Sequence, residues 1–256
     1  MKSFIAFINK EILELYRNGK LFLAVILFGL FGIMNPAMAK LTPWIMELSA
    51  ESLKESGMVL GEVKVDAMSS WTQFYKNMPI VLIIFVVLFS AILTNEYQKG
   101  TLINILTKGL KRWKVIAAKA TLLIVLWSVC YWMHYGITYG YTAYFWDNSI
   151  ASNLIMGALC PYLFGIWLIT LIFLLSTLLD GNVAVLTGVV GIVGGSYLVG
   201  IIPKIGKYLP TQLLSSGELL TGAGSPSDYM GAILVTLIIS GLGMVLSVLF
   251  FNRKNM

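Results

Sequence analysis

Residues 95–119 read NEYQKGTLINILTKGLKRWKVIAAK and join an apolar run at residues 79–94 to another at 115–139. They form the only long basic stretch with a motif-like pattern in a chain that is otherwise mostly apolar. A basic connection between two apolar runs is typical of a loop between membrane-spanning helices. The stretch therefore predicts that the chain crosses a membrane on both sides of it.

The composition extends this prediction to the whole chain. Hydrophobic residues make up 58% of the 256 residues and charged residues 12%, about half of the ~25% usual in soluble proteins. A helix that crosses the ~30 Å hydrocarbon core needs ~20 residues, and lipid allows no unpaired backbone amides. We therefore predict an all-α integral membrane protein, a single transmembrane domain over residues 1–256 with six transmembrane helices. The six apolar runs are residues 21–39, 79–94, 115–139, 154–179, 183–202 and 230–251.

Three further segments complete the predicted architecture. Residues 1–19 carry Ile5, Ile8, Ile12 and Leu15 at helical spacing, which favours an amphipathic helix along the membrane surface over a plain cytoplasmic extension. Residues 40–78 and 203–228 are expected to be extracellular loops. The second of these loops is rich in leucine and proline, so we expect it to form short re-entrant helices.

The distribution of charge predicts the orientation. With the N-terminus inside, twelve of the eighteen Lys and Arg residues but only four of the twelve acids fall on the inner side. The positive-inside rule then places both termini in the cytoplasm. Ala37-Met38-Ala39 resembles a signal-cleavage site, but the long region before it argues against cleavage. We expect no nucleic-acid partner, because the sequence offers no soluble basic face.

The sequence lacks the motifs of catalysis. Neither Gly19-Lys20 nor Gly206-Lys207 lies in a phosphate-binding Gly-x-x-x-x-Gly-Lys-Ser/Thr loop. The single histidine, His134, cannot form a His-rich metal site, and both cysteines fall in apolar runs. Acids are scarce inside the predicted spans, which argues against an ion-driven transporter. We therefore expect no enzyme activity, no metal and no cofactor in this chain.

The basic stretch has an ordered pattern. Glu96-Tyr-Gln-Lys-Gly100-Thr101-Leu102 is followed by Lys111-Arg112 and ends at Ala118-Lys119. This pattern resembles the cytoplasmic connection between spans two and three of ABC-2-type export permeases, the membrane subunits of bacterial ABC exporters. The sequence departs from that family at Gly109, where the family usually has proline. The predicted topology of the whole chain is similar to that of the family as well.

The resemblance implies a partner and a role. Residues 95–114 would form a coupling segment, with residues 100–110 as a helix docked on a separate ATPase subunit that is present in two copies and binds ATP and Mg. Leu102, Ile105 and Leu106 would offer it an apolar face, and Glu96 would anchor the segment on the N-terminal helix or on the ATPase. The alternative is a charge cluster that only orients the protein. The candidate coupling residues are Glu96, Gly100, Thr101, Leu102, Ile105, Leu106, Thr107, Lys108, Lys111 and Arg112.

The third span carries an aromatic stripe. Trp127, Tyr131, Tyr135 and Tyr139 recur every four residues over ~18 Å, and His134 lies among them. The stripe either lines a path for an amphipathic substrate or packs against neighbouring helices. His134 is more readily explained as a buried, hydrogen-bonded imidazole than as a switch.

Glycines favour close helix packing in two spans. The third span contains Gly136-x-x-x-Gly140, and the fifth contains Gly188 followed by Gly191-x-x-x-Gly195. The resemblance implies a second permease copy, or a related permease, and would place the fifth span at that interface. Packing within one chain is the alternative.

Together these features predict the membrane subunit of an ATP-driven exporter in the bacterial cytoplasmic membrane. The family branches that it resembles export phenol-soluble modulins or give immunity to lantibiotics, which implies amphipathic peptides or other amphiphilic compounds as substrates. The alternative function is a membrane scaffold or immunity protein that does not transport.

Overall fold

The computed structural model describes residues 2–54, 65–102, 107 and 109–254, and all regular elements among them are helical. The predicted coupling residues Ile105, Leu106 and Lys108 lie outside the described residues. The elements are α1 (Lys2–Arg17), α2 (Lys20–Lys54), α3 (Ala67–Phe89), α4 (Thr94–Gln98), α6 (Arg112–Phe145), η1 (Asn148–Ile150), α7 (Leu154–Leu178), α8 (Asn182–Gly200), α9 (Pro203–Gly206), η2 (Pro210–Ser215), α10 (Glu218–Thr221) and α11 (Pro226–Arg253).

Six described helices are long and apolar enough to cross a membrane, which confirms the predicted number. They are α2, the continuous segment Ala67–Gln98, α6, α7, α8 and α11. Span α7 is the most buried and contacts α11, α6, α8 and α3, whereas α8 is the least buried. Span α2 packs on α3 and α6.

The first span is longer than the apolar run that predicts it. The 35-residue α2 passes without a break through Pro36 and Pro43 to Lys54, and at ~1.5 Å per residue it is ~52 Å long. The next span begins at Ala67, where Asp66 caps the helix, and so extends back past Phe74 as expected. Much of the predicted loop at 40–78 is therefore helical, while its extracellular location stays a prediction.

Two prolines inside spans are accommodated by hydroxyl groups from other elements. Proline has no N–H, so Pro36 leaves the carbonyl of Gly32 without its helical partner, and Pro161 does the same to Gly157. Thr138 on α6 donates to the Gly32 oxygen at 3.1 Å. Ser216, just after η2, donates to the Gly157 oxygen at 3.0 Å. These bonds help to explain why α2 and α7 stay continuous.

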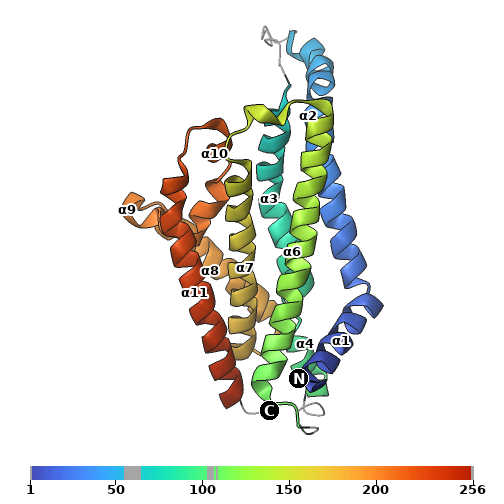
Figure 1. The fold of residues 1–256 in the computed structure, drawn as a ribbon, viewed down its shortest axis with the longest axis vertical. Coiled ribbons are helices and arrows are strands. Elements are labelled where there is room, and N and C mark those ends of the chain that lie inside the picture. The colour runs from blue at the N-terminus through green and yellow to red at the C-terminus, as the bar shows by residue number, and fades with distance from the viewer. Residues whose placement is uncertain (1, 55–64, 103–106, 108, 255–256) are drawn as a thin grey trace.

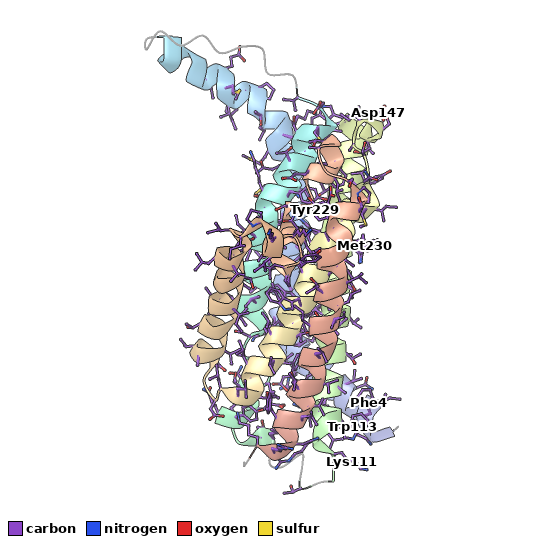
Figure 2. All side chains as sticks on the ribbon, turned by 90° about the vertical axis from the view of Figure 1, so that its left-hand side faces the viewer. Phe4, Lys111, Trp113, Asp147, Tyr229 and Met230 are labelled. Atoms are coloured by element: carbon purple, nitrogen blue, oxygen red, sulfur yellow. The ribbon has the colours of Figure 1, made fainter. Side chains whose placement is uncertain are left out.

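The two ends of the bundle differ. Both termini, α1 and α4 gather at one end, opposite η1 and α10 (Figure 1). Phe4, Lys111 and Trp113 mark the terminal end and Asp147 the other (Figure 2). The described parts of α1, α4 and the C-terminal end thus lie at the same end of the bundle, as six crossings require.

The segment between α8 and α11 folds into the short helices α9, η2 and α10, so the expectation of short helices here is confirmed. Leu213, Leu219 and Leu220 are buried, and η2 packs on α7, α8 and α11 while α10 packs on α7. These contacts explain the many leucines. Entry of the segment into the bilayer stays a prediction.

Candidate functional site

The N-terminal helix turns one stripe of side chains towards the bundle. Phe7, Glu11 and Leu15 recur at four-residue spacing and are all buried, while Ile5 and Ile12 are exposed. Leu15 is buried and Ile8 packs partly against the core, so the face that contacts the protein overlaps the predicted apolar stripe only in part. The exposed isoleucines leave an apolar face free of the bundle, and its placement on a membrane surface stays a prediction.

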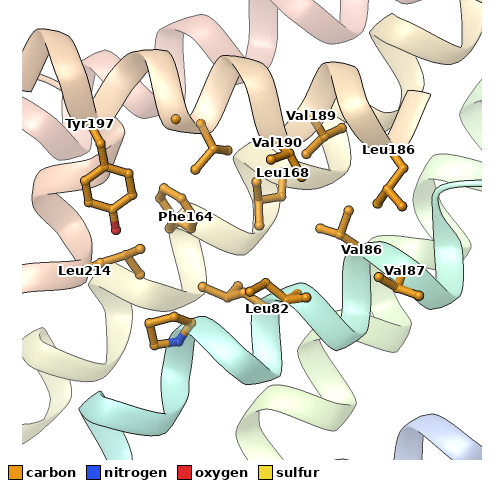
Figure 3. Close-up of a pocket in the computed structure, with 14 residues that line it drawn as sticks. Leu82, Val86, Val87, Phe164, Leu168, Leu186, Val189, Val190, Tyr197 and Leu214 are labelled. Carbon is orange, nitrogen blue, oxygen red and sulfur yellow. The ribbon is translucent and has the colours of Figure 1, made fainter. Parts of the chain in front are cut away.

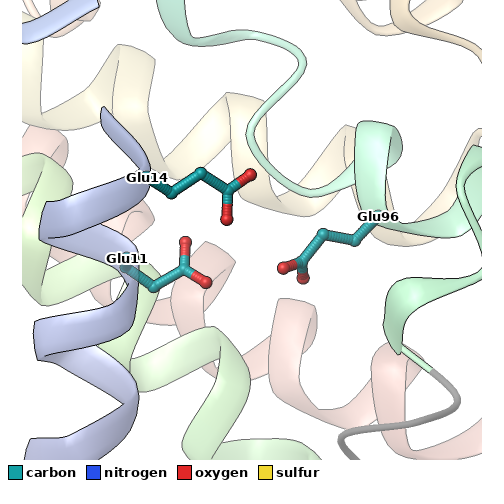
Figure 4. Close-up of side chains that lie close together, drawn as sticks. All are labelled: Glu11, Glu14 and Glu96. Atoms are coloured by element: carbon teal, nitrogen blue, oxygen red, sulfur yellow. The ribbon is translucent and has the colours of Figure 1, made fainter. Parts of the chain in front are cut away.

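A cluster of five charges joins this helix to the basic segment. The Lys10 ammonium lies 2.9 Å from Glu11, 2.8 Å from Glu14 and 2.9 Å from Glu96. The Lys119 ammonium, on α6, lies 2.5 Å from Glu11 and 3.3 Å from Glu96. Two lysines thus bridge three carboxylates from α1 and α4, which point towards one another in Figure 4.

Burial makes these ion pairs energetically important. Glu11, Glu96 and Lys119 are 3%, 4% and 1% exposed. A buried charge that loses its partner is strongly destabilising, so each member holds the others in place. Lys10 is half-exposed and closes the cluster on the solvent side.

The outer members of the cluster titrate at shifted pH. Burial acts to lower the pKa of Lys10, but hydrogen bonds to Glu14, Glu11 and Glu96 outweigh it and raise that pKa. Burial acts to raise the pKa of Glu14, but the hydrogen bond and charge of Lys10 outweigh it and lower that pKa. Both shifts favour the charged forms at neutral pH.

The three carboxylates could in principle bind a cation, because oxygens of Glu11, Glu14 and Glu96 lie within 4.8 Å of one another. The Lys10 ammonium already bonds to all three, so the lysines supply the positive charge that a metal would bring. A cavity of about 50 Å³ lined by Glu14, Asn95 and Glu96 adjoins the cluster and can admit water. The arrangement is that of a junction between helices.

Two more contacts tie α4 to the start of α8. The Thr94 hydroxyl bonds to the Asn182 side chain, which in turn donates to the Asn95 side-chain oxygen at 2.7 Å. Helix α4 has only five residues, yet through these contacts and Glu96 it is fixed to α1, α6 and α8.

The rest of the predicted coupling segment differs from expectation at two residues. Leu102 is buried in the protein's own core, so it does not present an apolar face to a partner. Arg112 donates to the backbone oxygens of Phe251, at 3.2 Å, and Lys254, at 2.5 Å, and so caps the end of α11.

The ends of the segment keep the expected turn chemistry. Gly100 and Gly109 both have positive φ, at 64° and 88°, which favours glycine. Thr101, Thr107 and Lys111 are exposed.

The first two members of the aromatic stripe pack inside the bundle. Trp127 and Tyr131 are fully buried and donate to the backbone oxygens of Tyr162, at 3.0 Å, and Ala158, at 2.5 Å, both on α7. A methyl group at Gly165 would lie 2.2 Å from the Trp127 ring, so this glycine makes room for the indole.

The upper part of the stripe packs against α3, with Tyr135 and Tyr139 beside Trp71. His134 is buried, stacks on Phe74 at 4.9 Å and bonds through Nδ1 to the Phe28 oxygen at 3.1 Å. These contacts support packing over a substrate path.

The glycines of the fifth span divide into two groups. A methyl group at Gly188 would approach Leu175 of α7 to 3.0 Å, so Gly188 serves packing within the chain. A methyl group at Gly191 or Gly195 would meet nothing within 4 Å, and the same holds for Gly136 and Gly140 on α6. The role of these outward glycines between two copies stays a prediction.

Sequence reasoning found Glu96 but missed its partners in the cluster. Glu11 occurs four residues after Phe7 and four before Leu15, so an acid interrupts an apolar repeat. Lys119 lies inside the apolar run at 115–139. Both are charges at positions that face the core, and this is the signal that could have paired them.

The fold and the cluster define a multi-pass α-helical membrane protein. The chain is similar to a protein described as uncharacterized transmembrane protein YxlG, from Bacillus subtilis (strain 168), with 24% identity over 260 aligned residues. The alignment covers 99% of this chain and 98% of that protein. No protein-family model matches the chain.

Proposed function

We propose that this chain is the membrane subunit of an ATP-driven exporter in the bacterial cytoplasmic membrane, with both termini in the cytoplasm. The observation that carries the proposal is the attachment of Glu96, where the Glu-x-x-x-Gly-Thr-Leu pattern begins, to α1 and α6 through Lys10 and Lys119. A segment that only oriented the protein would have no need of such buried ion pairs.

The contacts around α4 suggest how force would travel. A separate ATPase subunit that moves residues 100–111 would pull on α1 and α6 through Glu96, and on α8 through Asn95 and Asn182. Arg112 would carry the same displacement to the end of α11. Because these ties are short and at least partly buried, the four helices would move with the segment rather than independently of it.

The parts of the proposed complex divide the work. Two ATPase subunits bind ATP and Mg and hydrolyse ATP, while this chain, with a second copy or a related permease, forms the path. Substrates are amphipathic peptides or other amphiphilic compounds. The exposed isoleucines of α1 would rest on the inner membrane surface.

The test is ATP hydrolysis by the chain reconstituted with its ATPase subunit. Glu96→Gln keeps the shape of the side chain but removes its charge, and Gly100→Trp forces a bulky residue into a positive-φ position. We expect both variants to bind the ATPase yet lose the response of hydrolysis to substrate. Glu47→Gln, an exposed acid near the opposite end, is the matched control.

Two results would overturn the proposal. If no ATPase subunit binds the wild-type chain, the exporter assignment fails. If an ATPase binds but wild type shows no substrate-dependent hydrolysis, the chain is a docking scaffold or an immunity protein.

A further inference from the structure

An apolar groove opens between α3, α7 and α8. It has a volume of about 470 Å³ and is lined by Leu82 and Val86 of α3, Phe164 and Leu168 of α7, and Val189 and Val193 of α8 (Figure 3). Tyr197 contributes the only polar side-chain atom among the lining residues. The groove is separate from the ionic cluster and from the aromatic stripe.

The groove opens to the outside of the bundle. Ile83 and Val87 on one rim and Val190 on the other are all more than half exposed. These residues lie on helices that are apolar enough to cross a membrane, so the opening faces hydrocarbon. Any occupant must therefore be apolar.

The shape of the groove is elongated. Its lining on α8 runs from Leu186 to Tyr197, which is ~16 Å along a helix. One leaflet supplies about half of the ~30 Å hydrocarbon core, so an acyl chain in one leaflet spans about the same length as the groove. Leu214 of η2 and Tyr197 lie together at one end of it, and Leu186 and Val87 lie at the other (Figure 3).

The direction of the groove identifies the leaflet. The Leu186 end is one helical turn from the Asp180–Asn182 turn, where Lys254 bonds to Asp180 at 2.6 Å. This end therefore lies on the side of the chain's termini. A lipid with its headgroup at that turn would extend its tail towards Tyr197.

Packing, and not the hydrophobic effect, must hold the occupant, because lipid tails are as apolar as the groove. A void in this place forfeits dispersion contacts along its whole lining, and a single extended chain restores them.

We propose that this groove binds one acyl chain of a lipid from the leaflet nearest the chain's termini. The site does not depend on an exporter role. It differs from general lipid contact because one chain is held between α3, α7 and α8, so binding should saturate at one lipid per protein.

Gly194 gives a direct test. It lines the groove, and a methyl group there would meet nothing within 4 Å, so Gly194→Phe can direct its ring into the groove. Gly195→Phe is the matched control, because it is the next residue, is equally unobstructed and does not line the groove. Val190→Trp fills the groove from the rim and serves if Gly194→Phe does not fold.

The probe is a phospholipid with a photoactivatable diazirine in its acyl chain, titrated into protein in nonionic detergent. Cross-linked peptides are then mapped by mass spectrometry. We expect labelling of α3 and α8 to saturate at one lipid per chain and to fall about tenfold in Gly194→Phe, because the filled groove loses the chain's contacts. Gly195→Phe should match wild type.

Two outcomes would overturn the proposal. In the first, labelling does not saturate, is equally strong at the exposed Leu234 and Ile238 of α11, and is unchanged in the groove-filling variants. The label would then report ordinary surrounding lipid. In the second, the groove is not labelled, and native mass spectrometry shows a dimer that Gly194→Phe dissociates. A second copy would then cover the groove.

Discussion

Lys119→Met tests how strongly the buried ion pairs hold the N-terminal helix to the bundle. Lys119 is 1% exposed, and its ammonium contacts Glu11 and Glu96 at 2.5 and 3.3 Å. Methionine fills similar space but leaves two buried carboxylates with only half-exposed Lys10 to compensate them. Removing one partner of a buried pair costs about 3–5 kcal/mol. At ~2–4 °C per kcal/mol, the Tm should fall by about 10 °C.

The assay is thermal unfolding of the purified protein in detergent, followed by circular dichroism. Lys114→Met, on the same helix but outside the cluster, should change the free energy of unfolding by less than ~0.5 kcal/mol. Glu11→Gln combined with Lys119→Met should be more stable than Lys119→Met alone, because it removes an uncompensated charge. If Lys119→Met has the same Tm as Lys114→Met, the cluster does not hold the helix. The same conclusion follows if adding Glu11→Gln lowers the Tm of Lys119→Met further.

Two further predictions concern packing and pH. Gly165→Ala places a methyl group 2.2 Å from the buried Trp127 ring and should cost ~1–3 kcal/mol of unfolding free energy, whereas Gly136→Ala, which meets nothing within 4 Å, should be neutral or slightly stabilising. The same thermal assay decides between them. Lys10 holds the pKa of Glu14 below its ordinary value of 4.5, so this contribution to stability is present above that pH and is lost as the pH falls through the lowered pKa. The Tm should be steady over roughly pH 5–8 and fall in acid, and Glu14→Gln should reduce the acid-dependent part of the fall.

The number of spans was predictable because each apolar run is about as long as the bilayer is thick. The true length of α2 was not. Pro36 and Pro43 suggest the end of a helix. The carbonyl that Pro36 leaves unpaired is satisfied by the hydroxyl of Thr138, a residue about a hundred positions away. Such a bond depends on the packing of α2 against α6, which local sequence does not encode.

The candidate site was predictable in part for a similar reason. Glu96 was found because it belongs to an ordered local pattern, but Lys10 and Glu11 lie on a helix whose orientation depends on tertiary contacts. The spacing of the isoleucines indicated an amphipathic helix and not which of its faces meets the protein. Leu102 and Arg112 were assigned to a partner because nothing local shows that they contact the protein's own core and the end of α11.

The hydroxyl caps on the proline-freed carbonyls have a consequence for biosynthesis. Gly32 enters the bilayer well before Thr138 has been synthesised, and Gly157 likewise precedes Ser216 in the chain. In hydrocarbon an unpaired carbonyl is costly, so α2 and α7 are each incomplete when they are first inserted. The Gly32 and Gly157 carbonyls gain partners only when a later segment arrives beside them. The first and fourth spans therefore gain the stabilisation of these two hydrogen bonds only after the chain downstream has folded against them.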